Sequence, residues 1–178
     1  MKISILLPYK ENFSSKYAGA VSLFVKDTTI NSKYKKSIYV FGHTKYKSTL
    51  LKNYINLDIK KNILQSNNKI YVEKFIEHEK SNPSDLIEIH NRPNYVKFLT
   101  HNTNTKLILY FHNDPLTMNG SKSLIERRDL LKKTHKLVFN SKWSRDRFIQ
   151  SFNKFEIPED KLNIIYQSSK KVKINFNK

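Results

Sequence analysis

Short apolar runs alternate with amphipathic stretches along almost the whole chain of 178 residues, and this alternation constrains the fold more than any other feature. The apolar runs have the length and the β-branched and aromatic residues of buried strands. They occupy residues 2–8, 37–42, 54–58, 85–90, 105–112, 135–140 and 158–167. The stretches between them place apolar residues at helical spacing, in 18–30, 66–83, 92–102, 121–134 and 141–153. We therefore predict an α/β, Rossmann-like fold with a doubly wound, mainly parallel sheet of about seven strands and helices on both faces.

The stretch 66–83 fits two secondary structures. Its segment KIYVEKF resembles a strand in composition. The same segment also carries an apolar stripe at i, i+3, i+4 spacing, formed by Val72, Phe75 and Ile76. The residues from Ser66 to Asn68 are candidate N-caps, and Pro83 is a candidate stop. Because a parallel sheet needs crossover connections, we favour a helix here.

The last two predicted helices carry clear start signals. Ser121 or Ser123 can cap the helix in 121–134. The core candidates of that helix are Leu124, Leu130 and Leu131. Ser141 is the expected N-cap of the helix in 141–153. The aromatic residues available for packing in that helix are Trp143, Phe148 and Phe152.

The composition excludes several classes of protein. The chain has no cysteine, which rules out disulfides and cysteine-based zinc sites. No apolar run approaches the roughly 20 residues of a membrane-spanning helix, and the start MKISILLPY is too short for a secretory signal. We therefore expect a cytoplasmic protein. The formal net charge of +18 indicates an anionic partner, or else only the bias of a chain rich in lysine and asparagine.

Polar residues gather where the predicted strands end. In doubly wound sheets, ligands bind beyond the carboxyl ends of the strands, where loops and helix N-termini converge. Three histidines lie at such ends, namely His43, His90 and His112. Imidazoles together with Asp114 are legitimate metal ligands, but the chain has no HxH or HExxH pairing, and a metal site is disfavoured. His112 and Asp114 are candidates for acid–base chemistry, although Asp114-Pro115 also has the residues of a turn.

The small residues Ala18-Gly19-Ala20 open the first predicted helix, where the backbone can approach an anionic ligand. The dinucleotide fingerprint GxGxxG is missing, and no acidic residue ends the second predicted strand, so NAD binding is disfavoured. The motifs GxxxxGK[ST] of P-loop NTPases and GxSxG of α/β-hydrolases are absent as well. The common nucleotide and hydrolase signatures therefore do not explain this chain.

The order of these features resembles the N-terminal domain of retaining glycosyltransferases of family 4, which have the two-domain GT-B fold. The resemblance rests on a strand ending at Pro8, on the Ala-Gly loop, and on four longer segments. These are DLIEIHNRP (85–93), LILYFHNDPLTMNGSKS (107–123), KLVFNSKWSRDRF (136–148) and KLNIIYQ (161–167). The parts HNDP…MNG and FNSKWSRDRF are the most specific. They resemble bacterial enzymes that build lipopolysaccharide or related surface glycans.

The resemblance implies roles for the residues at the strand ends. His112 matches a catalytic histidine that lines the donor-sugar pocket. The implied donor-binding residues are Ala18, Gly19, Asn113 and Asp114, with Ala-Gly where the family usually has Gly-Gly. The implied acceptor-binding residues are His90, Asn91, Arg92, Ser141 and Lys142. The substrates would be a nucleotide-sugar and a glycan or glycolipid acceptor, with no metal ion and no further cofactor.

The resemblance also implies an incomplete enzyme. Residues 1–167 match the N-terminal domain, and the basic tail 168–178 resembles the linker to a second domain. In the family, that second domain supplies most of the nucleotide-sugar site. We expect no transferase activity from the chain alone, and a second domain acting in cis or in trans. The basic surface would help the protein to dock at the inner face of a membrane.

Two other functions fit the sequence. A non-catalytic Rossmann-like module could bind nucleic acid or a protein partner through its basic surface. Nucleic acid is the less favoured partner, because the chain has no arginine-rich arm and no run of five lysines. A basic stripe with interleaved tyrosine and phenylalanine would support it. A small-molecule nucleotide binder complete in one domain is the other function, and it would require a closed pocket.

Overall fold

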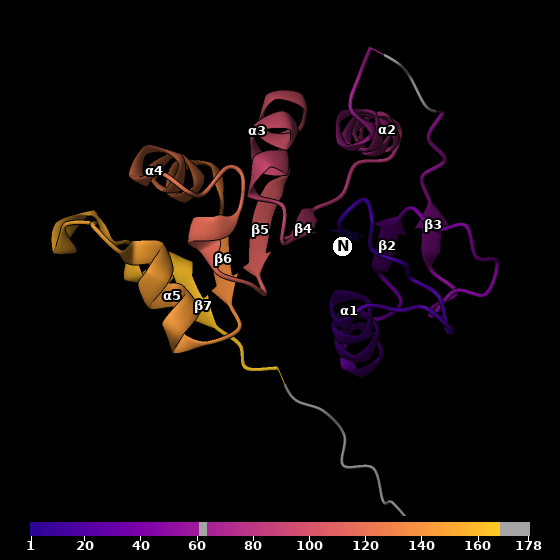
Figure 1. The fold of residues 1–178 in the computed structure, drawn as a ribbon. Helices are drawn as coiled ribbons and strands as arrows, with labels where there is room; N and C mark the ends of the chain where they lie inside the picture. Colours follow the sequence, from indigo (N-terminus) through magenta and orange to yellow (C-terminus); the bar gives the residue numbers. More distant parts are fainter. Residues whose placement is uncertain (61–63, 168–178) are drawn as a thin grey trace, which may run out of the picture.

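The chain forms a seven-stranded sheet in which all neighbouring strands are parallel (Figure 1). The computed structural model describes residues 1–60 and 64–167. The strands are β1 (Ile3–Leu6), β2 (Ile38–Gly42), β3 (Tyr54–Asn56), β4 (Leu86–His90), β5 (Lys106–Phe111), β6 (Lys136–Phe139) and β7 (Leu162–Ile164). Their order across the sheet is β3-β2-β1-β4-β5-β6-β7. This confirms the predicted Rossmann-like fold.

The order of the strands reverses between β1 and β4. From β1 the chain moves outward through β2 to β3, and then crosses back to β4 and moves outward in the other direction to β7. The connections that leave β1 and β4 therefore run to opposite sides. In such sheets, ligands bind at the carboxyl edge beside this reversal. All four residues of β1 are buried, as expected of a central strand covered on both faces.

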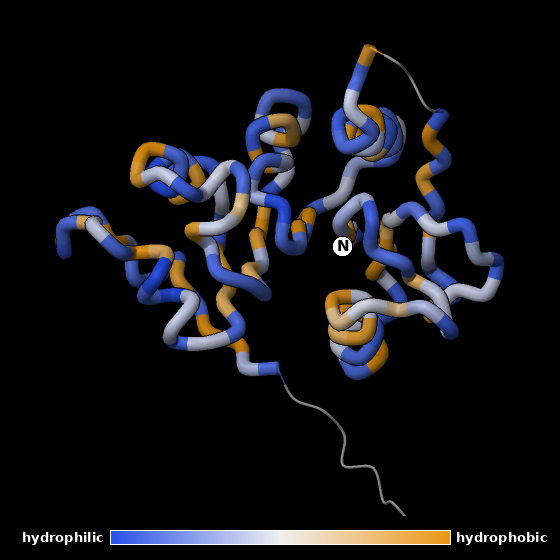
Figure 2. The backbone as a smooth tube through the Cα atoms, in the orientation of Figure 1, coloured by the Kyte–Doolittle hydropathy of each residue, from blue (hydrophilic) through white to orange (hydrophobic). Residues whose placement is uncertain are grey.

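Helices cover both faces of the sheet, but unequally. Of the described helices, only α1 (Ala20–Asn31) packs on one face, where Val21 and Val25 meet Ile5 and Val40. The other face is covered by α2 (Asn67–Ser81), α3 (Pro93–Asn102), α4 (Leu124–Lys133) and α5 (Lys142–Ile149). Figure 1 shows α1 apart from the row formed by α2, α3 and α4. Figure 2 shows apolar residues in the strands and along parts of the helices, while most connecting loops are hydrophilic.

Side-chain caps fix where two of these helices begin. Ser66 accepts a hydrogen bond from the first turn of α2, which confirms the helix favoured for that stretch. Ser123, rather than Ser121, begins α4. Its hydroxyl accepts from the backbone N–H of Glu126, whose carboxylate accepts from the N–H of Ser123, forming a capping box. Ser121 is fully buried and donates to the carbonyl of Pro115 instead.

The helix α5 is shorter than the sequence predicts. It ends before Gln150 because Ser151 has a φ of 70°, a left-handed conformation that a right-handed helix cannot continue. The buried Arg127 of α4 holds this end by donating to the carbonyl of Gln150 at 2.8 Å. Phe148 is fully buried, as expected, whereas Trp143 is 59% exposed and does not join the core.

The outer strands are also shorter than predicted. β3 keeps three residues of the run 54–58, and β7 keeps three residues of 158–167, because a 3-10 turn (Glu159–Lys161) precedes it. Both lie at the edges of the sheet and pair on one side only. The predicted basic tail 168–178 lies outside the described residues. Within 1–60 and 64–167, no helix is long and apolar enough to cross a membrane.

Candidate functional site

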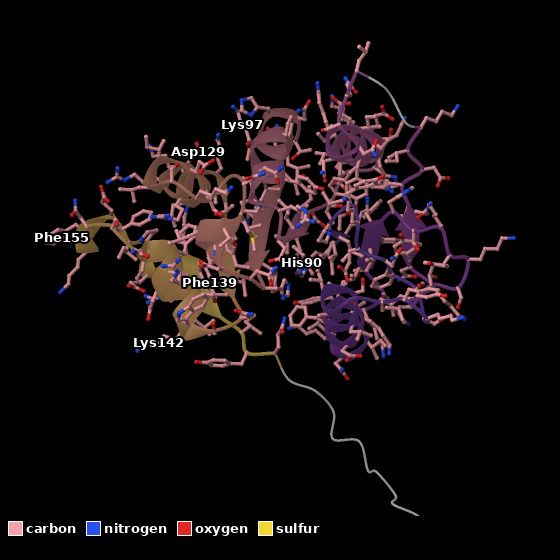
Figure 3. All side chains as sticks on the ribbon, in the orientation of Figure 1. His90, Lys97, Asp129, Phe139, Lys142 and Phe155 are labelled. Atoms are coloured by element: carbon pink, nitrogen blue, oxygen red, sulfur yellow. The ribbon has the colours of Figure 1, made fainter. Side chains whose placement is uncertain are left out.

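Two histidines meet at the carboxyl edge of the sheet. His90, labelled in Figure 3, ends β4. His112 follows β5, the neighbouring strand. Nδ1 of His90 lies 2.9 Å from Nε2 of His112, and the two rings stack with their centroids 5.2 Å apart. Tyr110 stacks on His90, while Phe24 of α1 packs edge-on against His112. The catalytic candidate and one acceptor candidate are therefore in direct contact.

The surroundings of the pair determine which nitrogen donates. Nε2 of His90 is buried, has no hydrogen-bond partner among the described residues, and lies 3.8 Å from Oε2 of Glu88. A carboxylate so near favours a proton on this nitrogen, because the N–H dipole then points at the negative charge. Nδ1 of His90 consequently accepts, and Nε2 of His112 donates. Nδ1 of His112 accepts from the side-chain amide of Gln167 at 2.6 Å.

His112 is uncharged at neutral pH. Burial first, and then the electrostatic effect of the adjacent His90, lowers the pKa of His112 from 6.5 to about 3. The sequence suggests acid–base chemistry for this residue, but a neutral imidazole suits hydrogen bonding to a polar substrate group better. The neighbouring Tyr110 also stays neutral, since burial and then the charge of Glu88 raise its pKa.

Amide groups hold the backbone at His112. Asn91 has a φ of 52°, a left-handed conformation that asparagine tolerates better than most residues. Its Oδ1 accepts a hydrogen bond of 2.8 Å from the backbone N–H of His112. Nδ2 of Asn140, which follows β6, donates to the carbonyl of His112 at 2.8 Å. Residues after both neighbouring strands therefore fix the backbone of the catalytic candidate.

Asp114 has structural partners. Its carboxylate caps the turn η1 (Pro115–Thr117) by accepting from the N–H of Leu116, and it pairs with Arg147 of α5 at 3.0 Å. Burial alone would raise the pKa of Asp114, but the hydrogen bonds from Arg147 and Leu116 and the charge of Arg147 outweigh it and lower the pKa. These contacts favour the turn interpretation of Asp114. Asn113 lies exposed beside it.

The amino end of α1 already holds a carboxylate. Gly19 is the N-cap residue of α1 and follows Ala18, so the small residues do open this helix. Oε1 of Glu11 accepts a hydrogen bond of 3.0 Å from the N–H of Ser22 in the first turn. A β-carbon at Gly19 would lie 2.4 Å from that oxygen, so the glycine allows Glu11 to approach. The protein's own anion thus occupies the helix end at which a donor diphosphate is expected.

A cavity of about 400 Å³ lies at the carboxyl edge next to Asn91. Its walls come from the loop after β1, the first turns of α2 and α3, and the loop after η1. The basic residues in these walls are Lys10 and Arg92, and Nη1 of Arg92 donates to the carbonyl of Asn91 at 2.7 Å. Of the acceptor candidates, Asn91 and Arg92 line this cavity, whereas His90 faces His112.

Two further acceptor candidates lie away from the histidine pair. The hydroxyl of Ser141 caps α5 by accepting from the backbone N–H of Ser144 at 3.1 Å. Lys142 is exposed at the start of the same helix, on the outer side of the molecule and away from His90 (Figure 3). The structure therefore gives Ser141 a structural contact and does not bring Lys142 to the site.

The third strand-end histidine does not join the pair. His43 stacks on Tyr9, and its Nδ1 lies 3.0 Å from the carbonyl oxygen of Leu57. Contacts from His43 to the other two histidines are absent from the described part of the chain. No group of three or more histidine, aspartate or glutamate side chains that could hold a metal ion occurs in 1–60 and 64–167.

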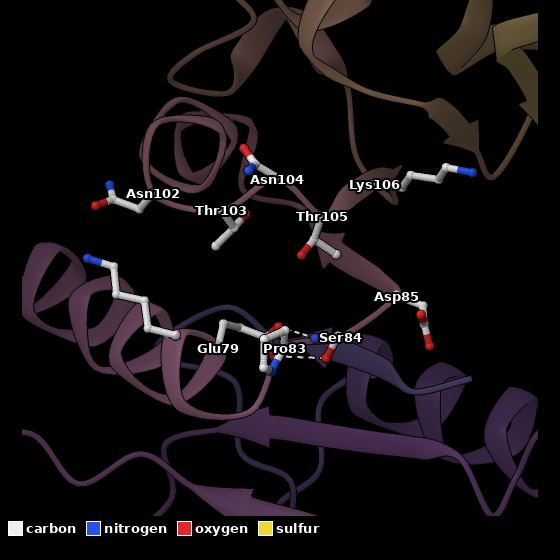
Figure 4. Close-up of a pocket in the computed structure, with 10 residues that line it drawn as sticks. Glu79, Pro83, Ser84, Asp85, Asn102, Thr103, Asn104, Thr105 and Lys106 are labelled. Carbon is white, nitrogen blue, oxygen red and sulfur yellow. Dashed lines mark hydrogen bonds between the residues drawn. The ribbon is translucent and has the colours of Figure 1, made fainter.

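A larger cavity, of about 470 Å³, lies at the opposite, amino edge of the sheet (Figure 4). Its wall includes Glu79, which is buried at the end of α2. This carboxylate accepts hydrogen bonds from the N–H and hydroxyl of Ser84 and from the hydroxyl of Ser4. Because these bonds satisfy Glu79 within the fold, and because ligands of such sheets bind at the other edge, we assign no site to this cavity.

The sequence did not reveal four contacts of the site. Glu88 faces His90 because residues two apart on a strand point the same way, so the pattern Glu-x-His could have signalled it. The other three contacts come from residues distant in sequence, and no local sequence pattern predicts them. These are Glu11, Arg147 and Gln167.

Comparisons with known proteins concern the fold. No protein-family model and no curated protein sequence matches the chain. The solved structure of HepE from Anabaena, in complex with UDP-glucose, is similar over 93% of this chain, with 16% identity and a TM-score of 0.59. Sucrose-phosphate synthase from Thermosynechococcus elongatus is similar over 95% of the chain, with 10% identity and a TM-score of 0.60. The likeness establishes the fold. The chain spans 44% of HepE and 49% of the synthase, which is just under half of each.

Proposed function

We propose that this chain is the acceptor-side half of a glycosyltransferase. The enzyme would move a sugar from a nucleotide-sugar to a glycan or lipid-linked acceptor during synthesis of a bacterial surface polysaccharide. The observation that carries the proposal is the neutral His112, held by His90 and Asn91 at the edge where such sheets bind ligands. The fold likeness to HepE, solved with UDP-glucose, and to a sucrose-phosphate synthase supports it.

His112 is the residue that we expect to touch the donor sugar. Its Nε2 is committed to His90, which fixes the orientation of the ring. Within the described residues, its Nδ1 accepts only from Gln167, an exposed side chain that can give way to a ligand. A sugar hydroxyl can replace that amide donor, so a neutral imidazole gains a hydrogen bond without accepting a proton. The proposal includes the retaining, metal-independent chemistry of family 4.

A second domain is part of the proposal, in the same chain or in another. The diphosphate of the donor carries negative charge, while Glu11 already fills the amino end of α1. Two anions at one helix end repel each other. The main cationic partners of the diphosphate would therefore belong to the second domain. The role of Gly19 would be limited to letting a ligand come close to the backbone. We propose that the chain alone has no transferase activity.

The proposed place of action is the cytoplasmic side of a membrane. A formal charge of +18 attracts the anionic lipids of that surface, because each basic residue near it adds a favourable contribution. Lipid-linked acceptors reside there, so surface docking would bring the protein to its substrate. Sedimentation with anionic and neutral vesicles tests this part, and equal binding to both would contradict it.

Nucleotide-sugar binding can be measured on the chain itself. Titration of UDP-glucose and other nucleotide-sugars into the isotope-labelled protein should shift the amide signals of Gly19, Asn91 and His112. Replacing His112 by Gln should abolish the shifts, whereas His101→Gln, on the exposed surface of α3, should leave them unchanged. A transfer assay on the chain alone should show no turnover.

Two results would contradict the proposal. If no nucleotide-sugar shifts these signals at millimolar concentration, the site does not bind a donor. If the chain alone transfers sugar, a second domain is not required.

A further inference from the structure

The cavity beside Asn91 carries two cations without anionic partners. In the part of the chain that the structure describes, no carboxylate lies within ion-pair distance of Lys10 or Arg92. Three other arginines each pair with a carboxylate, namely Arg128, Arg145 and Arg147. Nη1 of Arg92 is directed to a backbone carbonyl and its side chain also interacts with Tyr95, but a guanidinium has five N–H donors, so others remain for a ligand. An anion in the cavity would supply the missing charge.

The remaining polar wall donates hydrogen bonds and contains no acid. Asn91 is only 6% exposed, and the N–H of His112 occupies its Oδ1. Among the described residues, its Nδ2 has no partner. Asn68 likewise uses its Oδ1 for the hydroxyl of Tyr95, which leaves its Nδ2 as a donor. Amide donors and two cations together suit a ligand that offers several acceptor oxygens.

The amino end of α3 adds to the positive potential of this wall. Pro93 and Asn94 line the cavity, and the first turn of α3 contains no acidic residue. The partial positive charge of this helix end is therefore not neutralised, in contrast to α1, where Glu11 is bound. Gly120 has a φ of 94°, and a β-carbon there would lie 2.7 Å from the backbone nitrogen of Asn94. This glycine lets the loop after η1 lie directly against the start of α3.

We propose that this cavity is the subsite for a phosphate monoester on the acceptor, carried by a sugar or by a lipid. The inference rests on the proposed function and names the chemistry of its acceptor. A volume of about 400 Å³ has room for a sugar phosphate. Asn91 lines the cavity and also holds the backbone of His112, so the bound group would lie beside the catalytic candidate. Arg92 and Lys10 would pair with the phosphate, and Nδ2 of Asn91 would donate to it.

Binding of glucose 6-phosphate to the whole chain tests the inference, with glucose as the uncharged reference. Amide shifts should localise to the first turn of α3 and to the loop after η1, and glucose should bind at least about tenfold more weakly. Arg92→Gln and Lys10→Gln should each weaken binding of the sugar phosphate by about tenfold. Arg92→Lys keeps the charge but loses the planar fork, so its effect should be smaller. Lys97→Gln is the matched control, because it removes one charge from the exposed side of α3 (Figure 3).

Vesicles distinguish the two carriers of the phosphate. Binding to phosphatidic acid vesicles, lost in Arg92→Gln but kept in Lys97→Gln, would assign a lipid-linked monoester. Binding of glucose 6-phosphate alone would assign a soluble one. The inference is overturned if glucose binds as well as its phosphate, or if Lys97→Gln weakens binding as much as Arg92→Gln does. Binding of the sugar phosphate is measured without a nucleotide-sugar, so a failure of nucleotide-sugars to bind would contradict the proposed function and leave the phosphate subsite standing.

Discussion

The lowered pKa of His112 makes the stability of the protein depend on pH. The folded state protonates His112 only near pH 3, whereas the unfolded chain does so near 6.5. Between these values the unfolded state binds the extra proton, so stability falls as the pH falls. The contribution is fully present above pH 6.5 and is lost progressively toward pH 3. The substitution His112→Gln removes the titrating group and retains an amide that can donate to Nδ1 of His90.

The magnitude follows from the interval between the two pKa values. A pH of 5 lies about 1.5 units below the pKa of this histidine in the unfolded chain. Protonation of the unfolded chain therefore lowers the stability by about 2 kcal/mol relative to pH 8. The variant lacks this loss. We therefore compare the free energy of unfolding of the variant with that of the unchanged protein. From pH 8 to pH 5, the difference between them should shift by about 2 kcal/mol in favour of the variant.

Urea unfolding of both proteins at the two pH values measures this difference. Titrating groups far from His112 are shared, and their contributions cancel in the comparison, whereas His90, at 2.9 Å, is in contact with the substituted side chain, so the measured difference belongs to the pair. His101→Gln serves as a control at an exposed site and should not change the pH dependence by this amount. If the curves of His112→Gln and the unchanged protein shift in parallel, the burial of an uncharged His112 against His90 is refuted.

Four further substitutions, at three positions, test the contacts that hold the fold together. Phe148→Ala removes a fully buried ring that packs on Phe111 and Phe139, and should cost about 3–5 kcal/mol in urea unfolding. Ser123→Ala breaks the capping box of α4 and should cost about 1 kcal/mol by the same measurement, while a neutral result would contradict the cap. Glu79→Ala leaves the N–H of Ser84 without its acceptor and the hydroxyls of Ser4 and Ser84 with only each other, and should cost about 2–4 kcal/mol, whereas Glu79→Gln retains most of these bonds and should cost about 1 kcal/mol. Equal losses for the two Glu79 variants would contradict the assigned hydrogen bonds.

The fold was predictable because its strands are buried and its helices are locally signalled. Central strands covered on both faces appear as continuous apolar runs, such as ISIL in β1. The candidate caps from Ser66 to Asn68 located the start of α2, and the structure selects Ser66. The end of α5 was not predictable, since it depends on Ser151 in a left-handed conformation and on Arg127 reaching across from α4. Neither the backbone conformation of Ser151 nor the contact from Arg127 can be recognised in the local sequence.

The place of the candidate site in the sheet was predictable, but the contacts of its residues were not. The rule that ligands bind at strand ends places His90, Asn91 and His112 together, and the structure shows them in contact. The same rule says nothing about charge pairing between distant segments. Asp114 became a structural residue because Arg147, on α5, lies against it. A carboxylate beside a histidine in sequence is therefore weak evidence for an acid–base pair.

The amino ends of α1 and α3 both lie at this edge of the sheet, but among the described residues only the end of α1 has a carboxylate bound to it. At α1 the carboxylate of Glu11 satisfies the first turn, so an incoming anion meets repulsion there. The first turn of α3 contains no acidic residue, and Arg92 precedes it as the N-cap residue. The histidine pair lies between β4 and β5, and Asn91 connects it to the α3 side. A negatively charged group is consequently best accommodated beside α3, while a neutral sugar suits His112, so the proposed acceptor phosphate and the donor sugar would occupy different parts of this edge.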